Sequence, residues 1–238
     1  MAINIGLSKP ALSAGYAIAL GEYKDTTSIA KFGYNGQVGT SWETVWDGNN
    51  VYTYIDTAST ATVTSSNSLA DNGGTVKIYG VDANYDLVDE TLTIGGAAGV
   101  VEFYRVFRVE LVTATTGIAN VGTITVTVDS KSAALIQPTN GQTLMCIYTV
   151  PRNVSAYLIQ LDVGSSKDAE NEIRVMIKQN GQVQNTKDFI SIRGGFVTKP
   201  YSVPLYIPAE SDIEIQAQSG ATSAISAGFE LILVENKT

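Results

Sequence analysis

The chain has 238 residues, of which 44% are hydrophobic and 16% charged, and its formal net charge is −8. Its basic residues are scattered rather than clustered, so it lacks the Lys and Arg groups with which proteins neutralise a nucleic-acid backbone, and we expect no direct binding of DNA or RNA. The absence of histidine removes Ser-His-Asp and Cys-His catalysis and the common His-containing metal sites.

Residues 1–28 are expected to form an N-terminal arm. The apolar stretch at residues 11–20 is only about ten residues long, whereas a helix needs about 20 apolar residues to cross a membrane. It is interrupted by Gly15 and Tyr16 and preceded by a single lysine, unlike the basic start of a secretory signal. We therefore expect neither a membrane segment nor a signal peptide.

From residue 30 onward, apolar residues alternate with polar ones, a period that predicts β-strands with one buried face. The residues expected to share a buried face within a strand are Ile124, Val126 and Val128; Tyr157, Ile159, Leu161 and Val163; Ile173, Val175 and Ile177; and Ile213 and Ile215. The residues between them, such as Asp212 and Glu214, are expected to lie on a solvated polar face.

Turns rich in glycine and asparagine separate the strands. Asn180-Gly181 is the strongest hairpin signal, and residues 167–171 make one helical turn at most. A change of composition near residues 130–141 predicts two domains, at 29–135 and 140–238, each of a size usual for a β-sandwich. The expected fold class is all-β: two antiparallel, jelly-roll-like β-sandwich domains that follow the N-terminal arm.

Acidic residues cluster at 82–90, 168–172 and 210–214, and a pair of carboxylates is all that a glycosidase requires. Each cluster lies in an expected turn or on the polar face of a strand, so solvated side chains are the better interpretation. The single cysteine, Cys146, lies in an apolar run and is expected to be a buried, inert thiol. We predict no catalytic residue and no cofactor, and therefore no enzyme.

The loop at 82–86 has two interpretations. Asp82, Asn84 and Asp86 match the first three ligand positions of an EF-hand calcium loop. Leu87 and Thr93 stand where that motif requires a glycine and a bidentate glutamate. A β-hairpin turn therefore fits the sequence better than a calcium site, and we predict no metal ligand.

Two apolar groups are candidates for contacts with a partner. Trp42, Trp46, Tyr52 and Tyr54 are expected to pack in a core or a subunit interface, with an exposed carbohydrate-binding surface as the alternative. The last strand is apolar on both faces, so it is either central to a sheet or covered by a neighbouring subunit. Its residues, the candidate interface, are Phe229, Leu231, Ile232, Leu233 and Val234.

Several blocks of the chain resemble virion structural proteins of tailed bacteriophages, especially those of marine and cyanobacterial phages. The blocks are SWETVWDG at 41–48, VYTY at 51–54, VKIYGVDANY at 76–85, ETLT at 90–93, FYRVFR at 103–108, QTLM at 142–145, YTVP at 148–151, VPLYIP at 203–208, SDIE at 211–214 and FELILV at 229–234. The resemblance covers residues 30–235, and it is a whole-chain pattern rather than a catalytic motif.

The resemblance implies a capsid decoration (cement) protein that bridges and stabilises major-capsid subunits. Its expected partners are the major capsid protein and further copies of itself, with a homotrimer favoured because symmetric shells present three-fold sites. The implied location is the exterior of the capsid, after assembly in the bacterial host cytoplasm, with no membrane contact. The alternative is a tail or fibre appendage with a receptor- or carbohydrate-binding β-sandwich.

Overall fold

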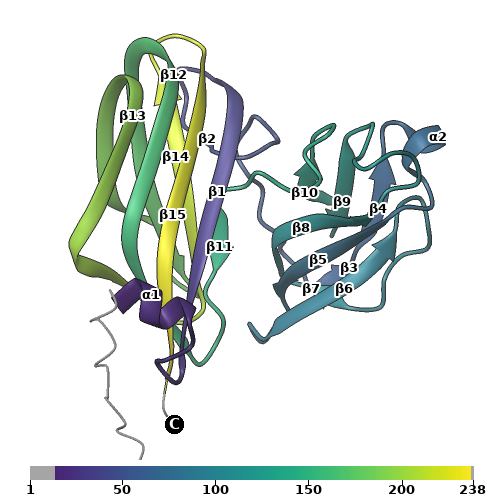
Figure 1. The fold of residues 1–238 in the computed structure, drawn as a ribbon, viewed down its shortest axis with the longest axis horizontal. Helices are drawn as coiled ribbons and strands as arrows, with labels where there is room; N and C mark the ends of the chain where they lie inside the picture. The colour runs from purple at the N-terminus through teal and green to yellow at the C-terminus, as the bar shows by residue number, and fades with distance from the viewer. Residues whose placement is uncertain (1–13, 237–238) are drawn as a thin grey trace, which may run out of the picture.

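The computed structural model describes residues 14–236, and the residues it describes form an all-β fold, as predicted. Figure 1 shows two parts side by side. The larger part contains β1 (Thr26–Val38), β2 (Glu43–Thr44), β11 (Ile147–Thr149), β12 (Val154–Gln179), β13 (Asn185–Ile207), β14 (Ser211–Ser219) and β15 (Ser223–Glu235). The short helix α1 (Ala14–Ala19) packs against β1.

The smaller part consists of short sheets and one helical turn. Its elements are β3 (Ser59–Thr60), β4 (Thr62–Ser65), α2 (Ser68–Asp71), β5 (Thr75–Val81), β6 (Leu87–Thr93), β7 (Glu102–Phe103), β8 (Arg105–Thr113), β9 (Ile124–Val128) and β10 (Lys131–Ile136). The sheets are ordered β6-β5-β8, β10-β9-β4 and β3-β7. Ile124, Val126 and Val128 share a buried face, as predicted.

β12 and β13 form a long hairpin in the larger part, and β12 lies between β15 and β14 in the strand order of the sheet. β12 pairs with β15 over residues 154–165 and with β14 over residues 171–179, while β13 follows it along the other edge. The change of partner falls at a register shift between Ser165 and Glu170. Residues 167–171 are therefore extended, and the helical turn allowed for there is not formed. The hairpin predicted at Asn180-Gly181 is confirmed.

The predicted alternation along β12 is half wrong because of a β-bulge. The register shifts between Leu158 and Gln160 against both neighbouring strands, and the extra residue of a bulge reverses the side-chain alternation beyond it. Leu158, Leu161 and Val163 consequently share the buried face, whereas Tyr157 is half-exposed on the other. After the second register shift, Ile173, Val175 and Ile177 are buried as predicted.

Strands β1 and β2 belong structurally to the larger part. β1 pairs with β15 from Thr26 to Val38, and β2 pairs with β14. The strand pairing thus differs from the division at 29–135 and 140–238, which assigned both strands to the first domain. It also shortens the expected arm, because the part of residues 1–28 that the structure describes already contains α1 and the start of β1.

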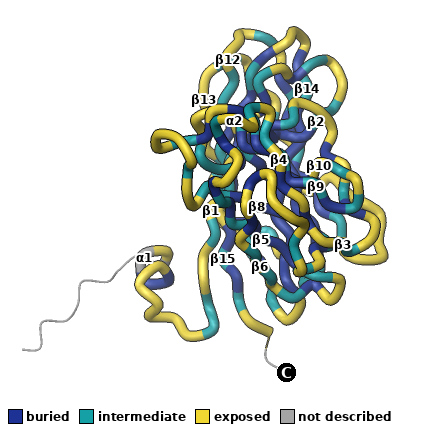
Figure 2. Tube along the Cα trace, turned by 90° about the vertical axis from the view of Figure 1, so that its right-hand side faces the viewer, coloured by how far each residue is buried: buried dark blue, intermediate teal, exposed yellow. Residues whose placement is uncertain are grey.

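Each part has a hydrophobic core, and each core includes residues of the other part. The larger core, built on β12, β14 and β15, also contains Val81, Tyr85 and Phe107. The smaller core includes Ile147 of β11, together with Trp46 and Met145 from the segments that connect the parts. Figure 2 shows the buried residues running through the interior of the body, with exposed residues on the turns. The two parts are therefore interlocked through shared core residues, and they are not separate domains joined by a linker.

Candidate functional site

The predicted interface strand is mostly buried inside the chain. β15 lies between β1 and β12, and the side chains of Phe229, Leu231 and Leu233 point into the larger core with exposed fractions of 1%, 0% and 7%. Ile232 and Val234 lie on the opposite face and are half-buried. The strand that is apolar on both faces was expected to be either central to a sheet or covered by a neighbouring subunit, and it is central. Its three core residues are not accessible to a partner.

The four aromatics proposed as an exposed surface do not form one. Trp46 and Tyr52 are buried at 3% and 4% exposure, and their rings pack edge to face at 5.1 Å. The indole N–H of Trp46 donates to Asn50 O, and the hydroxyl of Tyr52 donates to Ala133 O. Tyr54 packs on Tyr52 from the other side. The core interpretation is correct for these three, because folding brings the smaller part over them.

Trp42 stands apart from that cluster. It lies half-buried on the outer side of β12, where the Arg174 guanidinium carbon is 4.1 Å from its ring centroid. Phe189 of β13 meets the same indole ring edge-on at 6.2 Å. Arg174 also donates to the side-chain carbonyl of Gln216. Trp42 therefore belongs to a packed surface cluster and is separated from the other three aromatics.

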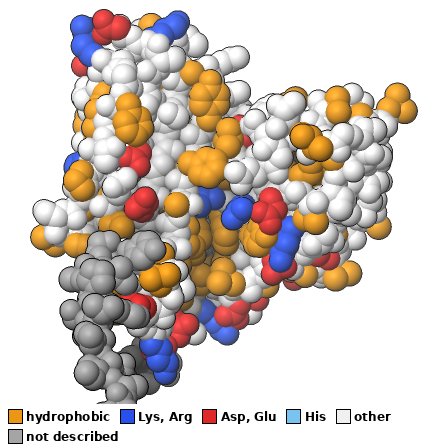
Figure 3. All heavy atoms as spheres, viewed as in Figure 1, with side chains coloured by type: hydrophobic (Ala, Val, Ile, Leu, Met, Phe, Trp, Pro, Cys, Tyr) orange, Lys and Arg blue, Asp and Glu red, His pale blue; other side chains and the backbone are white. Residues whose placement is uncertain are grey.

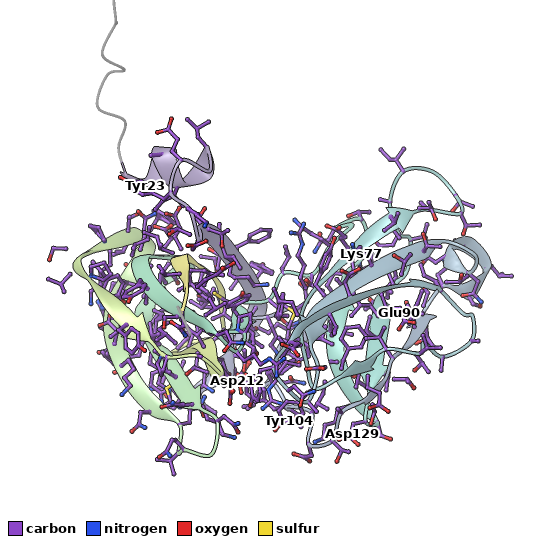
Figure 4. All side chains as sticks on the ribbon, turned by 90° about the horizontal axis from the view of Figure 1, so that it is seen from below. Tyr23, Lys77, Glu90, Tyr104, Asp129 and Asp212 are labelled. Atoms are coloured by element: carbon purple, nitrogen blue, oxygen red, sulfur yellow. The ribbon has the colours of Figure 1, made fainter. Side chains whose placement is uncertain are left out.

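A buried ion pair joins the two parts of the molecule. Arg105 of β8 donates from Nε to both carboxylate oxygens of Asp212 on β14, each at 3.1 Å. The two side chains are only 5% and 4% exposed. The Nη1 group of Arg105 donates to the carbonyls of Ile55 and Tyr104. Figure 4 shows Asp212 and Tyr104 where the two parts meet.

Aromatic rings enclose this guanidinium. Its central carbon lies 4.0 Å from the ring centroid of Tyr104 and 5.0 Å from that of Tyr54. A cation over a ring face is attracted by the ring quadrupole, more strongly when water is excluded. Tyr85 packs on the far side of Tyr104, with ring centroids 5.6 Å apart. The junction is thus a charged pair set in an aromatic shell.

Glu214, two residues beyond Asp212, completes the junction. One oxygen accepts from the Thr44 hydroxyl at 2.5 Å and from Gln216 at 2.8 Å. The other accepts from the hydroxyl of Tyr54 and the amide of Gln184, both at 3.2 Å. Burial raises the pKa of Glu214 and of Asp212, and the positive charge of Arg105 opposes the rise at Asp212.

The prediction of a solvated polar face for Asp212 and Glu214 is therefore wrong. Every residue from Ser211 to Ala217 is buried, because Ile213 and Ile215 face the larger core while the acidic residues face the smaller part. The carboxylate oxygens of both residues accept hydrogen bonds from protein groups. Such an arrangement holds two units together, and it offers no free carboxylate to a substrate.

The cysteine is buried, as expected, and a lysine that the sequence analysis did not single out lies beside it. Cys146 is fully buried, and burial raises the pKa of its thiol. Lys31 extends from β1 toward β8 and donates to the Phe107 carbonyl. Burial lowers the pKa of Lys31 to about 7. Lys31 lines a cavity of about 440 Å³ between the two strands, so it is a second polar contact between the parts.

The loop at 82–86 is a hairpin turn, as predicted. One oxygen of Asp82 accepts from the backbone N–H groups of Asn84 at 2.8 Å and Asp86 at 3.0 Å. Tyr85, with a φ of +61°, inserts its buried ring into the larger core. Among residues 14–236, no cluster of three or more acidic, Cys or His side chains is placed to hold a metal ion. Because Tyr85 enters the larger core, the turn docks the smaller part on the larger part.

Several large apolar side chains are exposed on the outer surface. On β13 they are Phe189, Phe196, Val203 and Tyr206. Among the strands that the structure describes, β13 pairs with β12 alone, so its other edge has no partner strand there. The smaller part exposes Leu69 on α2 and Val100 and Ile118 at loops. Single exposed apolar residues are common, whereas groups of them mark contact surfaces. No helix in the described part of the chain is long and apolar enough to span a bilayer.

Comparisons with known proteins give only remote structural likenesses. No family model matches the chain, and no curated protein matches it. Structures of infectious bursal disease virus align with it: the Gt strain at 13% identity and a TM-score of 0.24, covering 89% of this chain and 73% of that chain. The Gx strain gives 11% and 0.28, covering 88% and 72%. The VP2 subviral particle gives 11% and 0.25, covering 89% and 72%. At these TM-scores, the likeness assigns neither a fold nor a function to the chain.

Proposed function

We propose that the chain is a structural protein of a tailed-phage virion, a capsid decoration protein that bridges and stabilises major-capsid subunits. The proposal rests first on the resemblance of residues 30–235 to virion proteins of such phages. In this role the chain acts by contact alone and is not an enzyme. It works on the exterior of the capsid, after assembly in the host cytoplasm, without nucleic acid, membrane or cofactor.

The observation that carries the proposal is that buried charged side chains bind one another where the two parts of the chain meet. Arg105, Asp212 and Glu214 are buried and paired, and their geometry locks two β-rich parts into one body. A bridging protein benefits from this property, because a clamp between two shell subunits resists small separations only if its two ends are rigidly connected. Contacts that span two subunits would then oppose their separation under the pressure of the packaged genome.

The contacts of such a clamp would use exposed apolar side chains at its two ends. In the larger part, Val203 and Tyr206 of β13 are 81% and 55% exposed. In the smaller part, Leu69 on α2 is 96% exposed and Ile118 in a loop is 100% exposed. A homotrimer is the assembly that we propose, because cyclic oligomers repeat one surface patch with the symmetry of a three-fold position in the shell.

Cryo-electron microscopy of the phage particle tests the proposal. The expected result is density for the chain over the shell surface, bridging neighbouring capsid subunits, and hundreds of copies per particle by quantitative mass spectrometry. Density confined to the tail or neck, with a few copies to a few dozen, would contradict the decoration role. A particle that lacks the chain altogether would contradict the virion role as well.

A second measurement addresses the mechanism. Particles of a phage in which the gene for the chain is deleted are expected to lose their genome at a lower temperature than complete particles, and adding the purified chain is expected to restore the original temperature. Particles of equal thermal stability with and without the chain would exclude a stabilising role, even if the chain is present on the shell.

A further inference from the structure

The outer face of β1, β15, β12 and β13 carries an aromatic groove that the proposed function does not use. Strand pairing places its residues in two neighbouring rows across the four strands. The rows are Tyr34, Ser226, Gly164 and Phe196, followed by Phe32, Gly228, Asp162 and Thr198. A cavity of about 530 Å³ lies over this face, and that volume is within the usual range for ligand sites.

Three exposed rings surround the groove. Phe32, Tyr34 and Phe196 are 47%, 42% and 67% exposed, which is unusual for rings that belong to regular strands. Tyr34 and Phe196 stand at opposite ends of one row, three strand spacings or roughly 14 Å apart. Figure 3, which views this face, shows hydrophobic side chains spread over it with acidic groups between them. The rings therefore line an elongated surface rather than a tight cage.

Glycines keep the floor of the groove open. A Cβ atom at Gly164 would lie 2.6 Å from the Ser226 hydroxyl and 3.5 Å from the ring of Phe196. A Cβ atom at Gly228 would lie 3.8 Å from the Cβ of Phe32. Any larger residue at these two positions would fill the space between the rings, so the small floor residues give a ligand access to the ring faces.

Two acidic side chains, Asp162 and Glu230, line the groove. One oxygen of Asp162 accepts from the Gln160 amide at 2.9 Å, whereas the other is buried without a hydrogen-bond partner. That oxygen is enclosed by protein atoms, so it is not open to a ligand in the groove. The side chain of Glu230, in contrast, is exposed. Lys31 lines the groove too, but its ammonium donates to the Phe107 carbonyl.

We propose that this groove binds a neutral oligosaccharide. The C–H groups on the faces of sugar rings carry partial positive charge, and they pack on the negative faces of Phe32, Tyr34 and Phe196. Sugar hydroxyls supply the donors that the exposed carboxylate of Glu230 accepts. The two carboxylates and the engaged ammonium disfavour anionic ligands. This activity goes beyond the structural role, and it is independent of where on the particle the chain is located.

Binding of neutral oligosaccharides to the purified chain tests the proposal. The probes are maltotetraose, cellotetraose, chitotetraose, mannotetraose and a galactose tetrasaccharide, each titrated by calorimetry. At least one is expected to bind with a dissociation constant below a millimolar. Phe196→Ala is expected to weaken that binding tenfold or more. Glu230→Gln is expected to weaken it several-fold, because it replaces the charged acceptor.

The control is Phe189→Ala. Phe189 lies on the same strand and is 48% exposed, but it pairs with Arg174 and packs on Trp42, outside the two rows of the groove, so its removal is expected to leave sugar binding unchanged. Thermal unfolding of each variant confirms that the fold is retained. The proposal fails if no probe binds, or if Phe189→Ala weakens binding as much as Phe196→Ala.

The face could instead be covered by a second copy of the chain, and sedimentation distinguishes this outcome. An oligomer of the wild-type chain that dissociates on Phe196→Ala, together with the absence of sugar binding, would assign the groove to subunit contact and overturn the proposal. Sugar binding that is lost in Phe196→Ala while the oligomeric state stays unchanged would support it. The decoration role is decided separately, by the location and copy number of the chain on the particle.

Discussion

Arg105 makes three kinds of contact at the same time. It pairs with Asp212 through Nε, donates to two backbone carbonyls, and lies against the rings of Tyr54 and Tyr104. Only a planar guanidinium can donate in several directions within its plane while its faces remain free to stack. A lysine at this position would keep the charge and lose both the fork of donors and the stacking surface.

Removing the guanidinium leaves a buried carboxylate without its partner. We expect Arg105→Met to lower the free energy of unfolding by about 3 to 5 kcal/mol, the usual cost of breaking a buried ion pair from one side. Chemical denaturation at pH 7 measures the change. The double variant Arg105→Met with Asp212→Leu is expected to recover much of the loss, because no buried charge then remains uncompensated.

The exposed pair Lys77–Asp89 provides the matched control for the buried one. Its atoms are 3.0 Å apart, but the side chains are 33% and 54% exposed. Solvent screens such pairs, so Asp89→Asn is expected to leave the free energy of unfolding nearly unchanged. Equal losses from Asp89→Asn and Arg105→Met would contradict the claim that burial gives the junction its importance.

Asp47 makes the stability of the fold depend on pH. Its carboxylate accepts from the backbone N–H of Leu144 at 2.8 Å, but burial raises its pKa from 3.8 to about 6. A carboxyl whose pKa is raised by folding contributes stability that is present below about pH 4 and is lost as the pH rises through about 6. The loss amounts to at most about 3 kcal/mol.

Asp47→Asn removes this dependence, because an amide does not ionise and its carbonyl still accepts from Leu144. The variant is expected to gain stability relative to the wild type as the pH rises from 4 to 7. Urea unfolding of both proteins at several pH values gives the difference directly. A difference that stays constant across this range would show that Asp47 ionises as easily in the folded chain as in the unfolded one.

At the scale of elements, the docking of β1 depends on a close backbone approach. A Cβ atom at Gly33 would lie 2.3 Å from Val45 O and 2.4 Å from the backbone nitrogen of Cys146. Both neighbours are backbone atoms, so no side chain can rotate away to make room. Gly33→Ala is therefore expected to destabilise the fold by about 3 kcal/mol, at the upper end of the usual cost of overpacking.

Thermal unfolding measures this loss, with Gly15→Ala as its control. Gly15 lies in α1, where an added Cβ atom would meet nothing within 4 Å, and alanine is the better helix former. We expect this variant to be at least as stable as the wild type. If Gly33→Ala unfolds at the wild-type temperature, β1 does not need the close approach to the chain at Val45 and Cys146.

The strands of this fold could be predicted from sequence better than their partners could. Alternation located the buried faces of 124–128 and 173–177, and Asn180-Gly181 located the hairpin, because both signals are local. The bulge after Leu158 carries no such signal, since one inserted residue reverses the alternation without changing its composition. The pairing of β1 with β15 joins residues about two hundred positions apart, and it depends on tertiary packing.

The candidate site was harder still to predict. Asp212 and Glu214 alternate with isoleucines, which is the pattern of a strand with one solvated face. Only the position of the smaller part shows that this face is covered. Arg105 lies between apolar neighbours in 103–107, and that setting is the one available sign that its charge is buried. The groove around Asp162 is assembled from four strands, so no segment of sequence contains it.

At the scale of the whole molecule, the chain enters the larger part, leaves it to build the smaller part, and returns. The range 140–238 therefore lacks elements that its own sheet requires. Alone, it would lose β1 from the edge of β15, β2 from β14, and the core residues Val38, Val45 and Phe107. It would also lose the cover that the smaller part provides over Asp212 and Glu214.

We accordingly expect a fragment of residues 140–238 to lack a cooperative unfolding transition and to bind the dye ANS, although its length is that of an ordinary domain. Adding a peptide of residues 24–50 is expected to restore part of the sheet, because it supplies both missing strands. Trp42 and Trp46 are the two tryptophans of the chain and both lie in the peptide, so a blue shift of its emission reports docking. A fragment that unfolds cooperatively without the peptide would show that the larger part folds independently of β1, and that the interlocked topology is not needed for its stability.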